Sequence, residues 1–145
     1  RRSSDLKSCI PYLNALTLLI MKKVIHTSDA PAAIGPYSQA VESSNILFIS
    51  GQIPICPQEG KIISTTIDGQ TEQVFSNIEA ILKSAGYSFG QIVKTTVFLT
   101  DMSHFAAMNE IYKRFFTEDC PARSTIAVKE LPQGALVEIE TIAMK

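Results

Sequence analysis

Residues 136–144 constrain the fold of this chain most. Their side chains alternate as in a β-strand, and yet both of the resulting faces carry apolar residues. Successive side chains of a strand point to opposite faces of a sheet. One face would carry Val137, Ile139, Thr141 and Ala143, and the other Leu136, Glu138, Glu140, Ile142 and Met144. Two helices, the number that the sequence predicts, can cover only one face of a sheet. Because large exposed apolar patches are uncommon on soluble monomers, we expect further copies of the chain to cover the second face.

The remaining hydrophobic patterns predict one mixed sheet and two helices. Extended runs bounded by turn residues predict strands at residues 23–27, 38–42, 46–50, 92–100, 123–129 and 136–144. Apolar residues at helical spacing predict a helix at about residues 69–85 and a second one that ends near Phe115. The resulting order, β-β-β-α-β-α-β-β, indicates an α+β fold with both helices on one face of the sheet.

Polar residues and glycines predict where the helices begin and end. We expect Asp68 to be the N-cap of the first helix and Gly86 to stop it. Either Asp101 or Ser103 is expected to cap the second helix. Glycines and prolines between residues 51 and 60 predict a long loop before the first helix.

Residues 1–20 differ from the rest of the chain, and residues 21–145 are expected to form one domain. The first twenty residues combine a basic, serine-containing start with an interrupted apolar run that is too short to span a bilayer. They are compatible with a signal peptide, a transit peptide or an extension that does not belong to the domain. If ordered, this apolar segment is expected to pack on its own core or on a neighbouring chain.

Charge and cysteine content limit the partners and the compartment. Thirteen Lys and Arg against fourteen Asp and Glu give a net charge of −1, which does not favour nucleic acid as a partner. The three cysteines, Cys9, Cys56 and Cys120, have no C-x-x-C spacing and are typical of a reducing compartment. We therefore expect a cytoplasmic protein without a membrane anchor, or one of the mitochondrial matrix if residues 1–20 are a transit peptide.

Most catalytic motifs are missing from the sequence. His26 and His104 have no metal-ligand spacing, the glycines form neither a P-loop nor a dinucleotide fingerprint, and no G-x-S-x-G motif occurs. No metal and no cofactor are predicted. One polar constellation at predicted strand ends remains, made of Tyr37, Ser50, Asn109, Arg123 and Glu138. Arg123 could bind a carboxylate ligand or form an ion pair with Glu138 or Glu140, and Glu138 could be an acid/base group or an interface carboxylate.

Four motifs around these residues resemble the RidA/YjgF family, also known as liver perchloric-acid-soluble protein. They are APAAIGPYSQA at residues 30–40, ISGQIP at 49–54, VKTTVFL at 93–99 and PARS at 121–124. The resemblance covers residues 21–145. It implies a chorismate-mutase-like fold whose sheets close into a barrel-like core in a homotrimer, with a cleft at each subunit interface.

The resemblance also implies an activity, the hydrolysis of enamines and imines such as 2-aminoacrylate to 2-oxo acids and ammonia. This is the reaction of a 2-iminobutanoate/2-iminopropanoate deaminase. Arg123 would hold the substrate carboxylate with its planar fork, and Glu138 would activate water and shuttle protons. Tyr37, Ser50, Gly51 and Asn109 would line the cleft. Thr125 stands where many relatives have cysteine, which excludes thiol chemistry there but preserves a water contact of the backbone carbonyl.

Two other functions remain open from the sequence. Related sequences are also catalogued as endoribonucleases or translation inhibitors, but the net charge of −1 and the lack of tryptophan argue against RNA binding. Alternatively, Arg123 could bind small carboxylate metabolites without turnover.

Overall fold

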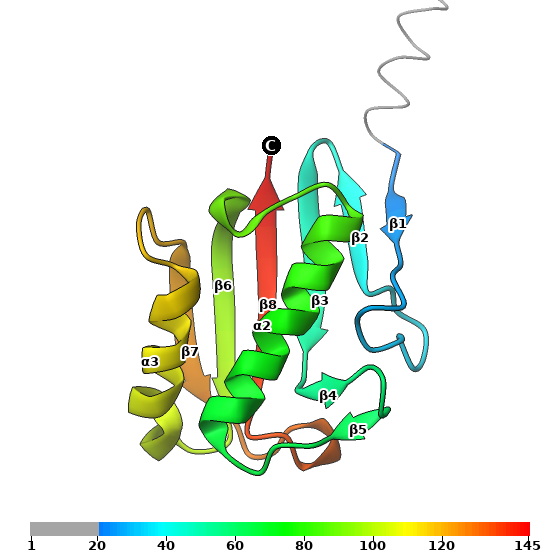
Figure 1. The fold of residues 1–145 in the computed structure, drawn as a ribbon. Helices are drawn as coiled ribbons and strands as arrows, with labels where there is room; N and C mark the ends of the chain where they lie inside the picture. Colours follow the sequence, from blue (N-terminus) through cyan, green and yellow to red (C-terminus); the bar gives the residue numbers. More distant parts are fainter. Residues whose placement is uncertain (1–20) are drawn as a thin grey trace, which may run out of the picture.

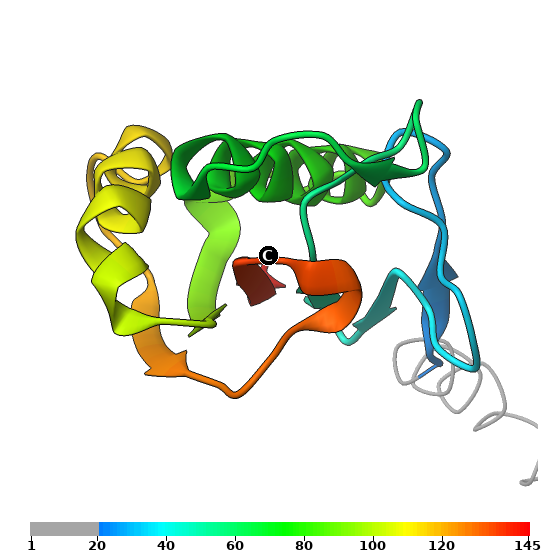
Figure 2. The same cartoon turned by 90° about the horizontal axis from the view of Figure 1, so that it is seen from below.

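The structure, a computed structural model, describes residues 21–145, which form a six-stranded sheet with two helices on one face (Figures 1 and 2). The strands lie in the order β1-β2-β3-β8-β6-β7, and only β6 and β7 run parallel. Their bounds are Lys23–Ile25 (β1), Ala40–Ser43 (β2), Ile46–Gln52 (β3), Ile92–Leu99 (β6), Ala122–Ala127 (β7) and Val137–Met144 (β8). The predicted α+β fold is confirmed. The predicted packing of residues 1–20 lies outside the described residues.

The segment expected to be a loop between β3 and the first helix contains a short hairpin. Strands β4 (Ile55–Cys56) and β5 (Lys61–Ile62) pair antiparallel, and the backbone N–H of Gly60 donates to the carbonyl of Cys56 at 2.8 Å. Two-residue strands are too short to show alternation, so only the turn residues between them are visible in the sequence.

Helix α2 (Ile67–Ser84) begins slightly earlier than predicted, because Thr66 and not Asp68 is its N-cap. The hydroxyl oxygen of Thr66 accepts a hydrogen bond from the backbone N–H of Gly69 at 3.2 Å. Asp68 lies in the first turn, where its charge still favours the helix dipole. Gly86 has a φ of +74° and ends the helix as predicted.

Helix α3 (Phe105–Phe115) follows a single 3₁₀ turn, η2 (Met102–His104). Asp101 caps this turn and accepts a hydrogen bond from the backbone N–H of Ser103 at 2.8 Å. Two further 3₁₀ turns, η1 (Phe89–Gln91) and η3 (Pro132–Gly134), precede β6 and β8.

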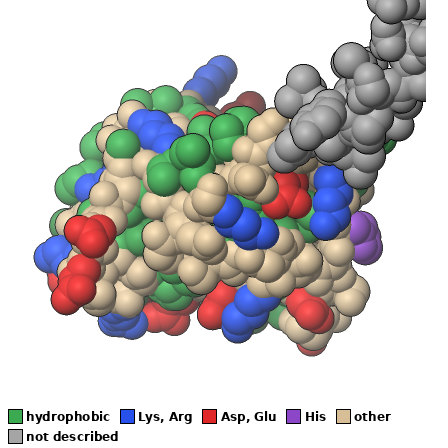
Figure 3. Space-filling model, turned by 90° about the horizontal axis from the view of Figure 1, so that it is seen from above, with side chains coloured by type: hydrophobic (Ala, Val, Ile, Leu, Met, Phe, Trp, Pro, Cys, Tyr) green, Lys and Arg blue, Asp and Glu red, His purple; other side chains and the backbone are tan. Residues whose placement is uncertain are grey.

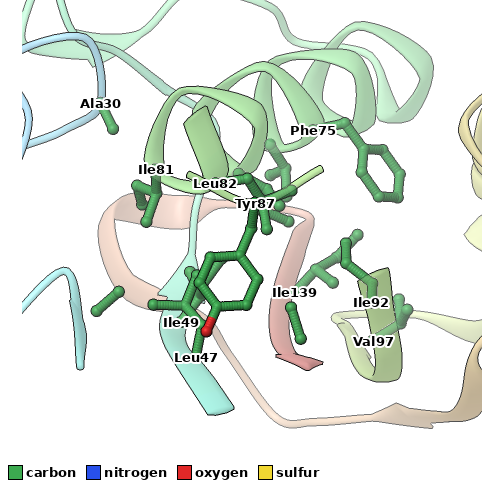
Figure 4. Close-up of a cluster of buried hydrophobic side chains, with 14 of the residues drawn as sticks. Ala30, Leu47, Ile49, Phe75, Ile81, Leu82, Tyr87, Ile92, Val97 and Ile139 are labelled. Atoms are coloured by element: carbon green, nitrogen blue, oxygen red, sulfur yellow. The ribbon is translucent and has the colours of Figure 1, made fainter. Parts of the chain in front are cut away.

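The core lies between α2 and the central strands (Figure 4). The helix contributes Val74, Phe75, Ile78, Ile81 and Leu82, and the strands contribute Leu47, Ile49, Val97, Leu99, Val137 and Ile139. Burial of each such side chain stabilises the fold by about 1.5–3 kcal/mol. The buried face of β8 is thus the one predicted from its alternation.

The opposite face of the sheet has no helix from residues 21–145 on it (Figure 2). Phe48, Ile126 and Met144 lie on this open face, and each exposes 47% of its surface. Their register partners Ile142, Phe98 and Ile46 lie on the same face. The second apolar face predicted from the sequence therefore exists in the single chain.

Candidate active site

Arg123 lies on the edge strand β7 and points toward the helices. In the parallel register it pairs with Thr95, whose side chain is buried beneath α3. Its NH1 group donates to Oδ1 of Asn109 at 2.8 Å, and its guanidinium carbon lies 4.5 Å from the ring centre of Tyr112. A guanidinium has five N–H donors, so this arrangement leaves donors for a carboxylate.

Thr125 follows Arg123 on the same face of β7, since residues two apart on a strand share a face. Its hydroxyl oxygen is buried and has no hydrogen-bond partner among the described residues. Unpaired buried hydroxyls are uncommon in folded proteins. The neighbourhood of Arg123 therefore has hydrogen-bonding capacity that residues 21–145 of one chain do not use.

Glu138 lies elsewhere, in a cavity of about 620 Å³ between the end of β3, β8 and the loops before β2 and β8. The lining residues include Ile34, Tyr37, Gln39, Ser50, Gly51, Ile53, Pro132, Glu138 and Glu140. The hydroxyl of Ser50 donates to the carbonyl of Ser38 at 2.6 Å and so ties β3 to the loop before β2. Tyr37 accepts a hydrogen bond from the backbone N–H of Ile34 at 3.2 Å.

Gly51 gives the Glu138 carboxylate its place in this cavity. A Cβ atom at residue 51 would collide with Oε1 of Glu138, so the carboxylate lies directly against the glycine backbone. Any side chain at residue 51 would force Glu138 to move.

Burial raises the pKa of Glu138, and the negative charge of Glu140 raises it further. Burial disfavours the charged form of a carboxyl group, as does a neighbouring carboxylate. A carboxyl group of raised pKa holds a proton more readily, and can therefore both accept and return one.

Comparison with known proteins places these features in a family. The profile of the family described as Endoribonuclease L-PSP matches residues 27–145. The chain belongs to this family. The 2-iminobutanoate/2-iminopropanoate deaminase of Mus musculus is 47% identical over 126 residues, which cover 87% of this chain and 93% of the mouse protein. A RutC family protein of Pyrococcus horikoshii is 54% identical over 125 residues, covering 86% of this chain and 99% of that protein.

Solved structures of the L-PSP family share the fold. The structure of Escherichia coli TdcF with bound serine matches with a TM-score of 0.81 and 45% identity, over 85% of this chain and 98% of TdcF. The resemblance to the RidA/YjgF family inferred from the four motifs is thereby confirmed.

The predicted site residues of this L-PSP family member form two groups in the single chain. Tyr37, Ser50, Gly51 and Glu138 meet in the cavity, which we call the glutamate half-site. Arg123, Asn109 and Thr125 form the arginine half-site on the helix side of β7. Glu138 pairs with Phe98 and therefore lies on the open face, whereas Arg123 shares the helix-covered face of Thr95.

The five residues of the predicted polar constellation thus do not meet within residues 21–145 of one chain. Arg123 forms no ion pair within residues 21–145, so the alternative of a pair with Glu138 or Glu140 would require a second copy of the chain. Strand alternation places Arg123 and Glu138 on opposite faces, and β6 separates their strands.

Sequence reasoning missed two residues of the glutamate half-site. Glu140 lines the cavity beside Glu138, and its position two residues further on the strand could have revealed it. Gln39 is buried, and its amide group donates to the carbonyls of Thr27, Ala30 and Pro31 at 2.8–3.3 Å. It fixes the loop that forms one wall. Gln39 lies within the motif at residues 30–40, but the motif did not reveal these contacts of its amide group.

The described residues offer few ligands for a metal ion. Within residues 21–145, no group of three or more His, Cys, Asp or Glu side chains is close enough to hold one. Among the same residues, no helix has the length and apolar character needed to cross a membrane.

Proposed function

We propose that this chain hydrolyses 2-imino acids and their enamine tautomers, such as 2-aminoacrylate, to 2-oxo acids and ammonia. The observation that carries this proposal is a guanidinium with no ion-pair partner among residues 21–145 and a carboxyl group of raised pKa, each in its own half-site. The guanidinium suits the carboxylate of a 2-imino acid, and the carboxyl group suits the proton transfers at its imine group. The name of the 47% identical mouse protein supports the same reaction.

The reaction needs one water and one group that moves protons. Water adds to the imine carbon, so that a C–O bond forms, the π bond of C=N breaks and the nitrogen takes a proton. Glu138 accepts the proton that the attacking water loses and returns it to the nitrogen. Glu138 then passes the hydroxyl proton of the resulting carbinolamine to the nitrogen. The C–N bond breaks as the C=O bond forms, and 2-oxo acid and ammonia are released.

Arg123 would hold the substrate carboxylate with its planar fork while Asn109 fixes one of its nitrogens. Thr125 would contact the reacting water through its backbone carbonyl. Ser50, Gly51 and Tyr37 would orient the substrate beside Glu138. The apolar wall of Ile34, Ile53 and Pro132 would face the substrate side chain.

A complete site on this reasoning requires two chains. Arg123 and Glu138 face opposite sides of one sheet, so the arginine half-site of one copy must meet the glutamate half-site of the next. In an open head-to-tail chain, the two end copies would each keep one unpaired half-site. In a closed ring every half-site is paired. We propose a homotrimer with three equivalent clefts, in which the open apolar faces pack together. Light scattering should give the mass of three chains, and an active monomer at low concentration would contradict this assembly.

The decisive experiment is an assay for ammonia from a freshly generated imine. Arg123→Ala should lose about 3–5 kcal/mol of transition-state stabilisation. Glu138→Gln should lower turnover by about 10²–10⁴-fold without changing the melting temperature or the assembly. Turnover within twofold of wild type in both variants would refute the proposal. If the wild-type protein binds the ligand but releases no ammonia, the chain is a binding protein and not an enzyme.

Endoribonuclease activity, which the family description names, has less support in this chain. Basic grooves and stacking aromatic residues are typical of RNA-binding surfaces. The net charge here is −1, and on the face seen in Figure 3 acidic and basic side chains are interspersed. The proposed catalytic carboxylate would also repel a phosphate backbone.

A further inference from the structure

Three residues of α3 form a cradle beneath the Arg123 guanidinium. Phe105, Asn109 and Tyr112 are spaced four and three residues apart, which places them on one side of the helix. Asn109 accepts the hydrogen bond from NH1, and the guanidinium carbon lies 4.5 Å from the ring centre of Tyr112 and 5.6 Å from that of Phe105. Both distances lie within the range of attraction between a cation and an aromatic ring.

Tyr112 is itself held rigidly. It exposes only 5% of its surface, and its hydroxyl shares a hydrogen bond of 2.8 Å with Oγ1 of Thr95 in β6. Phe75 contacts its ring edge-on at a centroid distance of 5.6 Å, and Phe116 lies at 4.6 Å. A ring fixed on three sides can in turn fix the group that rests on it.

The cradle has no net charge. Asn109 and Phe105 do not ionise, and burial raises the pKa of Tyr112, so this residue stays neutral at ordinary pH. No carboxylate within residues 21–145 forms an ion pair with Arg123. A carboxylate partner would orient the guanidinium equally well, but it would neutralise the charge that a carboxylate ligand needs. The electron-rich ring face attracts the cation without cancelling its charge.

We infer that Tyr112 is a positioning residue that holds Arg123 in place through its ring and leaves the positive charge free for a carboxylate ligand. This inference rests on the proposed function, in which Arg123 binds the substrate carboxylate. Tyr112 therefore acts on carboxylate recognition through Arg123 and not on the reacting atoms.

The test compares the binding of pyruvate and of pyruvamide, in which an amide replaces the carboxylate, by NMR titration of the full chain. Tyr112→Leu should weaken pyruvate binding about tenfold and change pyruvamide binding less than twofold. Tyr112→Phe keeps the ring and should bind pyruvate within about threefold of wild type. Equal weakening of both ligands by Tyr112→Leu would show a merely structural role and overturn the inference.

Tyr87 provides a matched control. It is also 5% exposed, and a cation, Nζ of Lys145, lies 3.9 Å from its ring centre, but it belongs to neither half-site. Tyr87→Leu should lower the melting temperature as Tyr112→Leu does, yet leave pyruvate binding unchanged. If Tyr87→Leu also weakens pyruvate binding, the weaker binding in Tyr112→Leu is a consequence of lost stability, and the inference is contradicted.

Two further variants separate this inference from the proposed function. Asn109→Asp places a carboxylate within reach of NH1, so it should weaken pyruvate binding at least tenfold even if Tyr112→Leu fails to fold. If Asn109→Asp binds pyruvate as tightly as wild type, the neutrality of the cradle is not needed for carboxylate binding, and the inference is overturned.

Arg123→Lys should lose pyruvate binding if the proposed function holds. Loss in Arg123→Lys with none in Tyr112→Leu refutes only the role of Tyr112, whereas no loss in Arg123→Lys refutes the carboxylate site itself.

Discussion

Glu138 and Glu140 share one cavity, and each of them influences what the other can do. The charge of Glu140 disfavours ionisation of Glu138, and Glu138 can accept a proton from water only when it is ionised. Activity should therefore fall as the pH drops through the raised pKa of Glu138.

Replacing Glu140 by glutamine should move this acidic limb of the pH profile to lower pH. The substitution removes the negative neighbour and lowers the pKa of Glu138, although burial still keeps it above the usual value. The measurement is kcat/KM for imine hydrolysis against pH, with the imine-generating enzyme in excess. A limb that stays in place or moves to higher pH would show that another group controls the reaction.

Gly51 offers a second test at the scale of single residues. Gly51→Ala should push the Glu138 carboxylate away from the β3 backbone and lower turnover by about 10²-fold, as small displacements of reacting groups do. The melting temperature should change little, because the glutamate side chain can rotate into the cavity.

Gly90→Ala is the control for this substitution. A Cβ there would meet only Oγ of Ser88, at an ordinary contact distance of 3.9 Å, and Gly90 lies outside both half-sites. Turnover in Gly51→Ala equal to that in Gly90→Ala would mean that the position of the Glu138 carboxylate is not critical.

At the scale of elements, two substitutions at the start of α2 compare the N-cap Thr66 with Asp68, an acidic residue of the first turn. Thr66→Ala should destabilise the protein by about 1 kcal/mol, because the backbone N–H of Gly69 loses its acceptor. Asp68→Asn should cost less, about 0.3–1 kcal/mol, because it removes only a favourable charge near the helix dipole.

Urea unfolding at one fixed protein concentration measures both changes, since the stability of an oligomer depends on concentration. A larger loss in Asp68→Asn than in Thr66→Ala would restore Asp68 as the N-cap.

At the scale of the whole molecule, mixed oligomers test whether the two half-sites come from different chains. Arg123→Ala and Glu138→Gln should each be inactive alone. When the two variants are unfolded together and refolded in equal amounts, about a quarter of the interfaces should pair an intact Arg123 with an intact Glu138. Activity should return to about that fraction of wild type.

Each variant refolded alone is the control for the mixture. Because no chain of the mixture carries both residues intact, a site built within one chain predicts no recovery. Inactive mixtures that still form trimers would contradict a shared site.

The sequence by itself determined the two helices and the six strands of the main sheet, because local spacing decides them, but not the short β4–β5 hairpin. The alternation of residues 136–144 predicted both faces of β8, and the apolar stripe of residues 74–85 predicted the buried side of α2. The N-cap was mistaken because Thr66 and Asp68 are both good capping residues, and only the backbone geometry distinguishes them. The motifs likewise named the chemical groups of the candidate site.

Only the tertiary structure decided how those groups are arranged. Arg123 and Glu138 lie fifteen residues apart in the sequence, and nothing local shows that β7 pairs parallel with β6 whereas β8 pairs antiparallel. The register of these pairings places the two side chains on opposite faces of the sheet. The contact of Tyr112 with Arg123 was equally hidden, because an aromatic residue on an apolar helix stripe predicts burial but not the cation above its ring. Such contacts depend on which elements pack together, and no local pattern encodes that choice.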